Sequence, residues 1–267
     1  MELRAFALKL LSEGHLDEKL FTPPSFTDFE PGDAKIVLSP QRIAPWEISR
    51  EKKVKTPKLQ GMPDPAQRVR ILHALANHEL QAVELFAWAI LAFPEAPKTF
   101  RQGLAKIVLD EQRHFRMYAA RMESMGTAFG DFPITGHFWT KIETITTPLQ
   151  FVCMMGLTFE NANLDFAQEY IDAATRAGDH ETADILEAVH KDEILHVRFG
   201  WHWLNAFKSS TDSHWDAYNE NVNWPLGPSR ARGANFDKQA RRKAGFSEEF
   251  IGNLQDAVAE SPGGSHR

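Results

Sequence analysis

The sequence predicts an all-α protein built on a four-helix bundle, with one extension before the bundle and another after it. Four long segments repeat apolar residues at helical spacing and are bounded by proline or glycine; they lie near residues 64–93, 97–125, 148–177 and 181–208. The pattern D-E-x-x-H-x-R occurs in two of them, at residues 110–116 and 192–198. A long connection at residues 127–147 lets the third helix start at the same end as the second. We therefore expect two antiparallel hairpins joined by a crossover.

The composition indicates one large domain with extensions. The chain has 267 residues, 43% of them hydrophobic, and a net charge of -6 with a pI near 6.0, which is neither a nucleic-acid nor a membrane signature. Its single cysteine, Cys153, excludes an intrachain disulfide framework, and a cysteine-built iron–sulfur centre needs about four thiolates. The sequence contains no recognisable signal peptide and no run of about 18 apolar residues. We expect a cytoplasmic protein without a membrane partner.

Three parts are expected along the chain. Residues 1–63 begin with a short amphipathic helix, MELRAFALKLLSEG, and continue as an extended arm that carries a charged run at residues 50–55. Residues 64–208 are expected to form the bundle. Residues 209–267 are expected to form short helices and loops that pack on it, including an amphipathic helix at 247–258 and a disordered end. The aromatic residues expected to cover the bundle are Trp215, Tyr218, Trp224 and Phe236.

The helices of the bundle have recognisable start and stop signals. Asp64 is expected to cap the first helix, with Pro65 in its first turn, and Pro94 is expected to end it. Gly126 ends the second helix, and Gly178 makes the turn between the third and the fourth. These signals set the lengths of the two hairpins.

The repeated pattern offers metal ligands in pairs. Positions i and i+3 of a helix project from the same face, so Glu111 with His114, and Glu193 with His196, can each direct a carboxylate and an imidazole at one point. All four lie among apolar residues, where a carboxylate costs several kcal/mol unless it is paired or bound to a metal. The pattern therefore predicts a bound partner for each pair.

Counting from the hairpin turns supplies one more glutamate for each pair. Glu79 and Glu111 each lie 16 residues from a turn near residue 95 (95 - 79 and 111 - 95), and residues equally far from a turn lie at the same height. Glu160 and Glu193 lie 17 and 16 residues from a turn near residue 177 (177 - 160 and 193 - 177). The alternative, Glu84, lies about 7.5 Å along the helix from Glu79 and about 140° round it, so Glu79 is preferred.

The predicted ligand set thus contains four carboxylates and two imidazoles: Glu79, Glu111, His114, Glu160, Glu193 and His196. Four negative charges inside a dry bundle repel one another, and two divalent cations neutralise them. Oxygen and nitrogen ligands together suit iron or manganese, and affinity alone does not choose between them. A single E-x-x-H is commonly a solvated surface pair. Here the motif occurs twice on apolar helix faces, and each copy lies at the same height as a further glutamate. This arrangement favours a metal site over two solvated surface pairs.

Three short motifs carry a family resemblance: L-H-A-x-A-x-x-E-L at residues 72–80, G-D-F-P at 130–133 and D-E-x-x-H-V at 192–197. With the six-residue set, they make residues 64–208 resemble the ferritin-like di-iron carboxylate superfamily. The motifs are most similar to a bacterial ferritin-like family of unknown function, which is related at fold level to the bacterial tRNA hydroxylase that modifies isopentenylated adenosine. The resemblance implies that the six residues are metal ligands. Asn77 departs from the family pattern, which has histidine there, and His78 stands beside it.

The resemblance also implies an oxidative function. Two iron ions, or manganese or a mixed manganese–iron pair, would activate dioxygen with electrons from an external donor. The expected reaction is hydroxylation, or a related oxygenase reaction, of a small-molecule or modified-nucleoside substrate. A ferroxidase or peroxide-scavenging iron protein and a non-enzymatic, metal-stabilised binding module are the alternatives. Extensions of about 60 residues on each side favour a covered cavity over a ferritin cage. The sequence does not decide whether the chain forms a homodimer.

Four residues near the ligands are candidates for supporting roles. His190 is either a neighbour or an additional ligand of the metal, or else a surface or packing residue. Tyr118 either takes part in electron or proton transfer or packs in the core. Asp110 and Asp192 are candidates to accept hydrogen bonds from the opposite hairpin's ligand histidine, or to pair with arginine, such as the one that ends each repeat.

Other polar residues have simpler expected roles. His73 and His78 flank Glu79 but point away from it, which favours supporting or surface positions, and Cys153 is expected to be a small buried residue. A basic cluster consists of Arg230, Arg232, Lys238, Arg241, Arg242 and Lys243. It is either a solvated or ion-paired surface or a contact for the phosphates of a substrate, and the first is the more common meaning.

Overall fold

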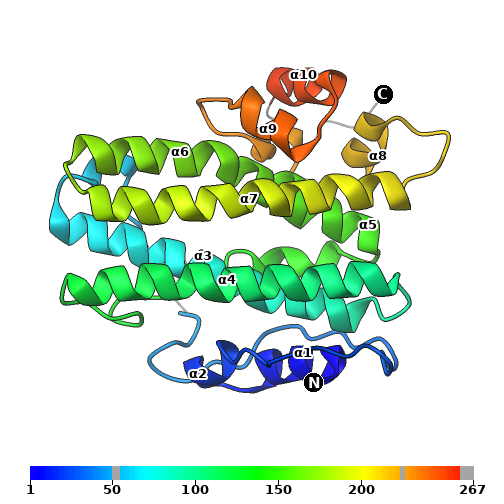
Figure 1. Cartoon of the computed structure of the whole chain (residues 1–267), viewed down its shortest axis with the longest axis horizontal. Helices are drawn as coiled ribbons and strands as arrows, with labels where there is room; N and C mark the ends of the chain where they lie inside the picture. The colour runs from blue at the N-terminus through cyan, green and yellow to red at the C-terminus, as the bar shows by residue number, and fades with distance from the viewer. Residues whose placement is uncertain (50–54, 223–225, 259–267) are drawn as a thin grey trace. The chain divides into compact units, whose positions relative to one another are not determined.

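The computed structural model of the protein describes residues 1–49, 55–222 and 226–258 (Figure 1). Over these residues every regular element is a helix, and β-type pairing is limited to two isolated bridges, between Glu2 and Thr27 and between Ile48 and Ile134. The prediction of an all-α protein is confirmed for the part of the chain that the structure describes.

The chain divides into two compact units, called unit 1 and unit 2 below. Unit 1 consists of Met1–Glu143 and Arg176–Thr182, and unit 2 consists of Thr144–Thr175 and Ala183–Arg267. Each unit contains most of one predicted hairpin. The division into residues 1–63, 64–208 and 209–267 stays a prediction.

Unit 1 is built on the hairpin of α3 (Pro65–Ala92) and α4 (Lys98–Ser124). Asp64 caps α3 as predicted, because its Oδ1 accepts a hydrogen bond from the N–H of Ala66 at 2.9 Å. After α4, Gly126 adopts a positive φ of 77°, which a glycine takes at little cost. The start and stop signals read from the sequence are confirmed for this hairpin.

The N-terminal segments cover one side of this hairpin (Figure 1). Helix α1 (Leu3–Ser12) buries Leu3, Phe6 and Leu10 and packs on α3, which confirms the predicted amphipathic helix. A single turn, α2 (Leu16–Lys19), follows it. The arm and the crossover contain the short 3-10 helices η1 (Leu59–Gly61) and η2 (Trp139–Thr144). Of the charged run at residues 50–55, residues 50–54 lie outside the described residues.

A buried polar stripe on α3 anchors the arm and the crossover. The stripe recurs at positions i, i+4, i+8 and i+11 and consists of His73, Asn77, Gln81 and Glu84. Gly130 donates its N–H to His73 Nε2 at 3.1 Å, and Asn77 Nδ2 donates to the carbonyl of Thr135 at 2.9 Å. Irregular segments must satisfy their backbone polar groups when they leave water, and this stripe does so here.

Unit 2 begins with one continuous helical stretch that changes its winding. It comprises α5 (Pro148–Phe151), the π-helix η3 (Val152–Phe159) and α6 (Glu160–Arg176). The predicted limits of 148 and 177 agree with it to within one residue, but the π-helical winding was not predicted. Thr158 supports that winding, since its hydroxyl donates to the carbonyl of Cys153 at 2.8 Å and lies 2.8 Å from the hydroxyl of Tyr218. Tyr218 is distant in sequence, so local spacing carried no sign of this contact.

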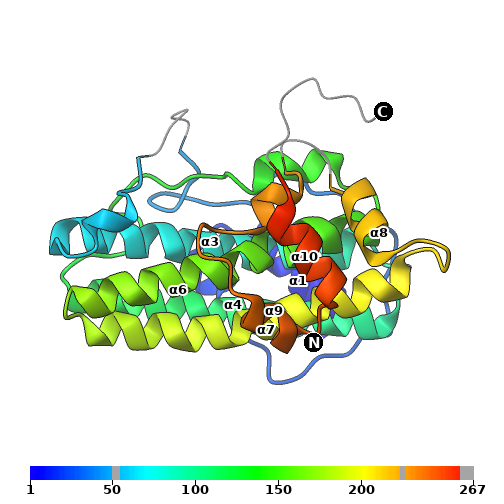
Figure 2. The same cartoon turned by 90° about the horizontal axis from the view of Figure 1, so that it is seen from above.

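The rest of unit 2 packs around α7 (His180–Phe207). It comprises α8 (His214–Glu220), η4 (Pro228–Ala231), α9 (Lys238–Ala244) and α10 (Glu248–Asp256). Figure 2 shows α9 and α10 over α7, where Trp201 packs on Phe246 and Phe250 with ring centroids 4.8 and 4.9 Å apart. The predicted last amphipathic helix is confirmed, and Tyr218, one of the aromatic residues expected to cover the bundle, is buried. Trp224 lies outside the described residues.

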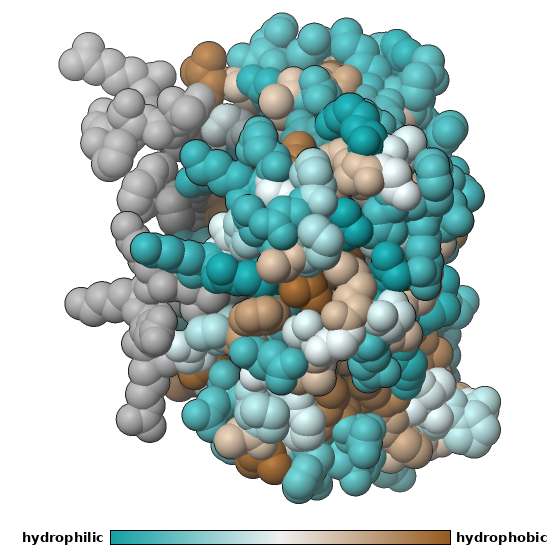
Figure 3. All heavy atoms as spheres, turned by 90° about the vertical axis from the view of Figure 1, so that its left-hand side faces the viewer, coloured by the Kyte–Doolittle hydropathy of each residue, from teal (hydrophilic) through white to brown (hydrophobic). Residues whose placement is uncertain are grey.

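The surface is mixed in character. Figure 3 shows one face, on which hydrophilic side chains predominate and hydrophobic ones form smaller groups. Among the described residues, no helix has both the length and the apolar character that a membrane crossing requires.

Candidate metal centre

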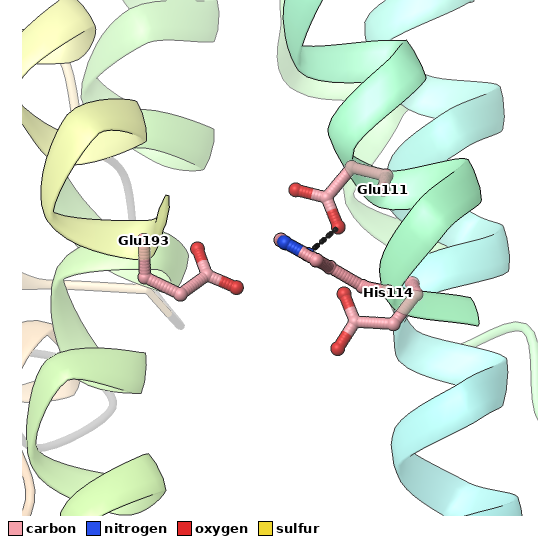
Figure 4. A group of neighbouring side chains, drawn as sticks. Glu111, His114 and Glu193 are labelled. Carbon is pink, nitrogen blue, oxygen red and sulfur yellow. Dashed lines mark hydrogen bonds and ion pairs between the residues drawn. The ribbon is translucent and has the colours of Figure 1, made fainter. Parts of the chain in front are cut away.

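Unit 1 contains a trio of buried side chains with metal-binding atoms. Glu79 comes from α3, and Glu111 and His114 come from α4, where a spacing of three residues places them on one face. Their ligand atoms lie within 4.8 Å of one another, and the three residues are 4%, 0% and 0% exposed. Figure 4 shows Glu111 beside His114, whose Nδ1 lies 3.4 Å from Glu111 Oε2. The structure thus brings together the three residues predicted for the first hairpin.

Unit 2 contains a second trio of the same composition. Glu160 is the first residue of α6, and Glu193 and His196 lie three positions apart on α7. Their ligand atoms again lie within 4.8 Å of one another, and all three residues are buried. His196 Nδ1 lies 3.3 Å from Glu193 Oε2, and Asn163 Nδ2 donates to Glu193 Oε1 at 3.5 Å. Figure 4 shows Glu193 projecting from α7.

Each trio has the chemistry of a divalent-metal site. Carboxylate oxygens and imidazole nitrogens bind such ions at about 2.0–2.2 Å, so two ligands of one ion lie at most about 4.4 Å apart. The ligand atoms of each trio lie within 4.8 Å of one another, which is close to that separation. Two carboxylates and one imidazole also provide the negative charge and the mixed donors that suit iron or manganese. The residues present therefore fit a bound metal ion.

Glu84, the alternative ligand on α3, has a different environment. It is 0% exposed, and it forms ion pairs with Lys19 at 2.9 Å and with Arg42 at 2.8 Å. Trp139 Nε1 donates to the same carboxylate at 3.0 Å. Burial by itself raises the pKa of Glu84, but the charges of Arg42 and Lys19 outweigh it and lower that pKa. Glu84 is thus an anchor for the N-terminal segments, and the structure groups Glu79 with the α4 residues, as the helix geometry favoured.

The four residues predicted to support the site have varied surroundings. His190 is half-buried and its Nε2 lies 3.2 Å from the carbonyl of Leu164. Tyr118 is 2% exposed, in the interior of α4. Asp110 accepts a hydrogen bond from Arg113 at 2.8 Å, and Asp192 is half-buried. Their supporting functions stay predictions.

The arginines that end the two repeats contact backbone carbonyls. Arg116 donates to the carbonyl of Leu20, and Arg198 donates to the carbonyl of Lys243. Each repeat is thus tied to the chain extension of its own unit. Gln112, beside the ligand Glu111, adds hydrogen bonds to the carbonyls of Lys19 and Phe21 at 2.8 and 3.1 Å. No local pattern of residues indicates these contacts.

The two histidines that flank Glu79 in sequence, His73 and His78, pack against aromatic rings. His73 is buried, stacks on Phe129 with centroids 4.9 Å apart, and has its pKa lowered to about 4, because burial disfavours the charged ring. His78 lies 5.2 Å from the ring of Phe138, and burial likewise lowers its pKa to about 4. The supporting or surface roles expected for His73 and His78 stay predictions.

The predicted basic cluster is divided by the structure. Arg241 is fully buried and binds Asp165 through two hydrogen bonds of 2.8 and 2.9 Å. Arg242 pairs with Glu248 at 2.6 Å, and Arg232 donates to a backbone carbonyl. The ion-paired interpretation of the cluster therefore holds for Arg241 and Arg242. Asp165 was missed in the sequence because its partner lies 76 residues away.

Cys153 is buried, as predicted. Burial raises the pKa of its thiol well above the usual range, so the side chain stays protonated and behaves as a small apolar group.

Comparison with known proteins identifies a family whose description names no activity. Residues 6–252 match the family described as "Protein of unknown function (DUF455)". A relative described as an uncharacterized protein of Haemophilus influenzae is 25% identical over 143 residues, which cover 51% of this chain and 50% of the relative. The chain therefore matches about half the length of this curated relative. No solved structure matches the chain.

Proposed function

Since the chain belongs to the family described as a protein of unknown function (DUF455), we propose its activity from its own residues: it is an oxygen-activating oxidoreductase with two metal ions, of the hydroxylase or oxygenase type. The observation that carries the proposal is the repeated trio of two buried glutamates and one buried histidine. One trio belongs to each helical hairpin.

We propose that the two trios line a single dinuclear centre inside a ferritin-like four-helix bundle. In carboxylate-bridged bundles of this kind, two helices each supply one glutamate and the other two each supply a Glu-x-x-His pair. This chain has that set, with Glu79 on α3 and Glu160 on α6 as the single glutamates. The ligands lie at nearly equal numbers of residues from the two hairpin turns. This supports a placement of all six residues at the same height along the helices.

The ligand residues have distinct tasks in this proposal. The four carboxylates hold two divalent cations and are neutralised by them, while His114 and His196 add nitrogen donors suited to iron or manganese. The metal pair, when bound, supplies the chemistry that activates dioxygen. Phe115, Leu164 and Val197, on the same helices as the ligands, are buried, and apolar packing of this kind would keep water from the site.

The remaining reactants are proposed from the composition and the resemblance. Electrons come from an external donor, because one cysteine cannot build an iron–sulfur centre within the chain. The substrate is a small molecule or a modified nucleoside.

Metal analysis and turnover test the proposal. Protein purified without added metal should contain about two ions of iron or manganese per chain, which elemental analysis measures. The reduced, iron-loaded protein should then consume dioxygen in step with the oxidation of an organic substrate, as mass spectrometry of a substrate panel would detect. A stable protein that binds no metal would overturn the proposal. Oxidation of many ferrous ions per chain into a mineral would support iron storage instead.

A further inference from the structure

A cavity of about 490 Å³ lies in unit 2, where the C-terminal half of α7 meets the end of α9. Its lining includes Arg198, Trp201, His202, Asn205, Lys243 and Gly245. We propose that this cavity binds a small organic phosphate.

The charge of the lining favours an anion. Arg198 and Lys243 contribute two permanent positive charges, and the lining contains no Asp or Glu. Arg198 also donates to the backbone carbonyl of Lys243, which fixes its guanidinium at the wall and leaves further N–H donors for a ligand. Two positive charges match a phosphate monoester, which carries a charge of about -1.5 to -2 near neutral pH.

The neutral groups of the lining present donors as well. Asn205 Oδ1 lies 3.1 Å from His214 Nε2, so that hydrogen bond uses the amide oxygen and leaves the NH2 group for a ligand. The ring of Trp201 stacks on His214 with centroids 4.5 Å apart, which occupies a ring face. The Cδ1–Nε1 edge of the ring lies beside Gly245, since a Cβ built on that glycine would lie 3.5 Å from Trp201 Cδ1 and 4.0 Å from Nε1.

The volume favours an organic phosphate over the bare ion. Small-molecule pockets have volumes of roughly 300–1,000 Å³, and this cavity lies in that range. A phosphate bound by Arg198 and Lys243 would leave space for a small attached group next to His202 and Trp201. Arg and Lys are both established phosphate-binding side chains.

This site is independent of the proposed metal centre. Arg198 and His202 are exposed and lie four positions apart, on the outer face of α7. Glu193 and His196 lie on the buried face of the same helix. Loss of metal binding would therefore leave this proposal standing, and the reverse also holds.

The test follows the indole N–H signal of Trp201 in 15N-labelled, full-length protein, with Trp201→Phe used to identify the signal. The protein is titrated with inorganic phosphate and with glycerol 3-phosphate, and sodium chloride at matched ionic strength is the reference. We expect a saturable shift with both phosphates and tighter binding of glycerol 3-phosphate. Equal or weaker binding of glycerol 3-phosphate would overturn the assignment to an organic phosphate.

Charge-removing variants locate the binding. Lys243→Gln should weaken it roughly 10-fold, because it removes a charge-assisted hydrogen bond. Lys238→Gln is the matched control, since Lys238 is exposed on the same helix but outside the lining, and it should bind as the wild type does. An equal response in both variants, or the same shift with chloride, would show a general ionic effect or binding elsewhere and would overturn the proposal.

Discussion

Glu84 and Arg42 form a bidentate ion pair between α3 and the N-terminal arm. Arg42 Nε donates to Glu84 Oε1 at 2.9 Å, and Arg42 Nη2 donates to Oε2 at 2.8 Å. Lys19 lies 2.9 Å from the same carboxylate, and the side chains of Lys19 and Glu84 are 1% and 0% exposed. One buried carboxylate thus compensates two buried cations that the N-terminal segments bring to the hairpin.

Replacing Glu84 with Gln should destabilise the protein strongly. The variant leaves the charges of Lys19 and Arg42 buried without their carboxylate, and removal of one partner from a buried ion pair costs about 3–5 kcal/mol. The free energy of unfolding, measured in urea, should fall by that amount. Glu123→Gln, an exposed carboxylate on α4, is the control and should change stability by less than about 0.5 kcal/mol.

The same variant separates the two glutamates of α3. Under native conditions, folded Glu84→Gln protein should keep the metal content of the wild type, whereas Glu79→Gln should lose metal. The reverse result would mean that Glu84 is the ligand.

The buried His73 should make stability depend on pH. Its folded pKa is about 4, because burial opposes the charge, while the ordinary pKa of histidine is 6.5. Between these two values the unfolded chain takes up a proton that the folded chain refuses, so stability falls as the pH falls from 6.5 towards 4. The loss approaches about 1.4 kcal/mol for each pH unit and ends below the folded pKa.

A comparison with His73→Gln isolates this effect from other titrating groups. The variant should be less stable than the wild type at pH 7, since it disturbs the hydrogen bond from Gly130 and the packing on Phe129. Urea unfolding at several pH values should show the difference shrinking between pH 6.5 and 4.5. A constant difference over that range would contradict the buried, neutral state of His73.

Gly200 should not tolerate a side chain. A Cβ on Gly200 would lie 3.1 Å from the Cα of Gly156, in the helical stretch that leads to α6, and neither backbone can yield easily. Gly200→Ala should therefore cost about 1–3 kcal/mol of unfolding free energy. Gly252→Ala is the matched control, because a Cβ there meets nothing within 4 Å, and in the helix α10 it should stabilise by about 0.5–1 kcal/mol. Equal effects of the two substitutions would contradict the close contact.

The helices could be predicted because their signals are local. Apolar spacing, the cap at Asp64 and the glycines after α4 and α6 act over a few residues, and the structure follows them closely. The winding of Val152–Phe159 and the pairs Glu84–Arg42 and Asp165–Arg241 could not be predicted, because each depends on a partner more than 40 residues away. Arg241, which the sequence placed in a basic surface cluster, is buried in its pair with Asp165.

The candidate site was predictable for the same reason. Each Glu-x-x-His pair is one turn of a helix, and the third residue of each trio follows from equal distance to a hairpin turn. The structure brings each trio together within its own unit. The identity of the metal and of the substrate depends on side chains whose positions do not follow from helical spacing, so the sequence pattern does not predict either.

Single-ligand variants should show whether the trios act as one centre. In the proposed dinuclear site, the carboxylates neutralise both ions. Loss of either glutamate should therefore weaken the binding of both ions. Glu111→Ala and Glu193→Ala should each retain fewer than one metal ion per chain, and the double variant should retain none, as elemental analysis would measure. Glu187→Ala, an exposed carboxylate on α7, is the control and should keep about two.

Thermal unfolding provides a second measure of the same coupling. A ligand present at about 100 times its Kd stabilises the folded state by about 2.7 kcal/mol, so a chelator should lower the Tm of the wild type and of Glu187→Ala. The chelator should leave the Tm of the double variant unchanged. If each single variant instead keeps one ion and half of the chelator effect, the two trios are separate mononuclear sites and the proposed shared centre is wrong.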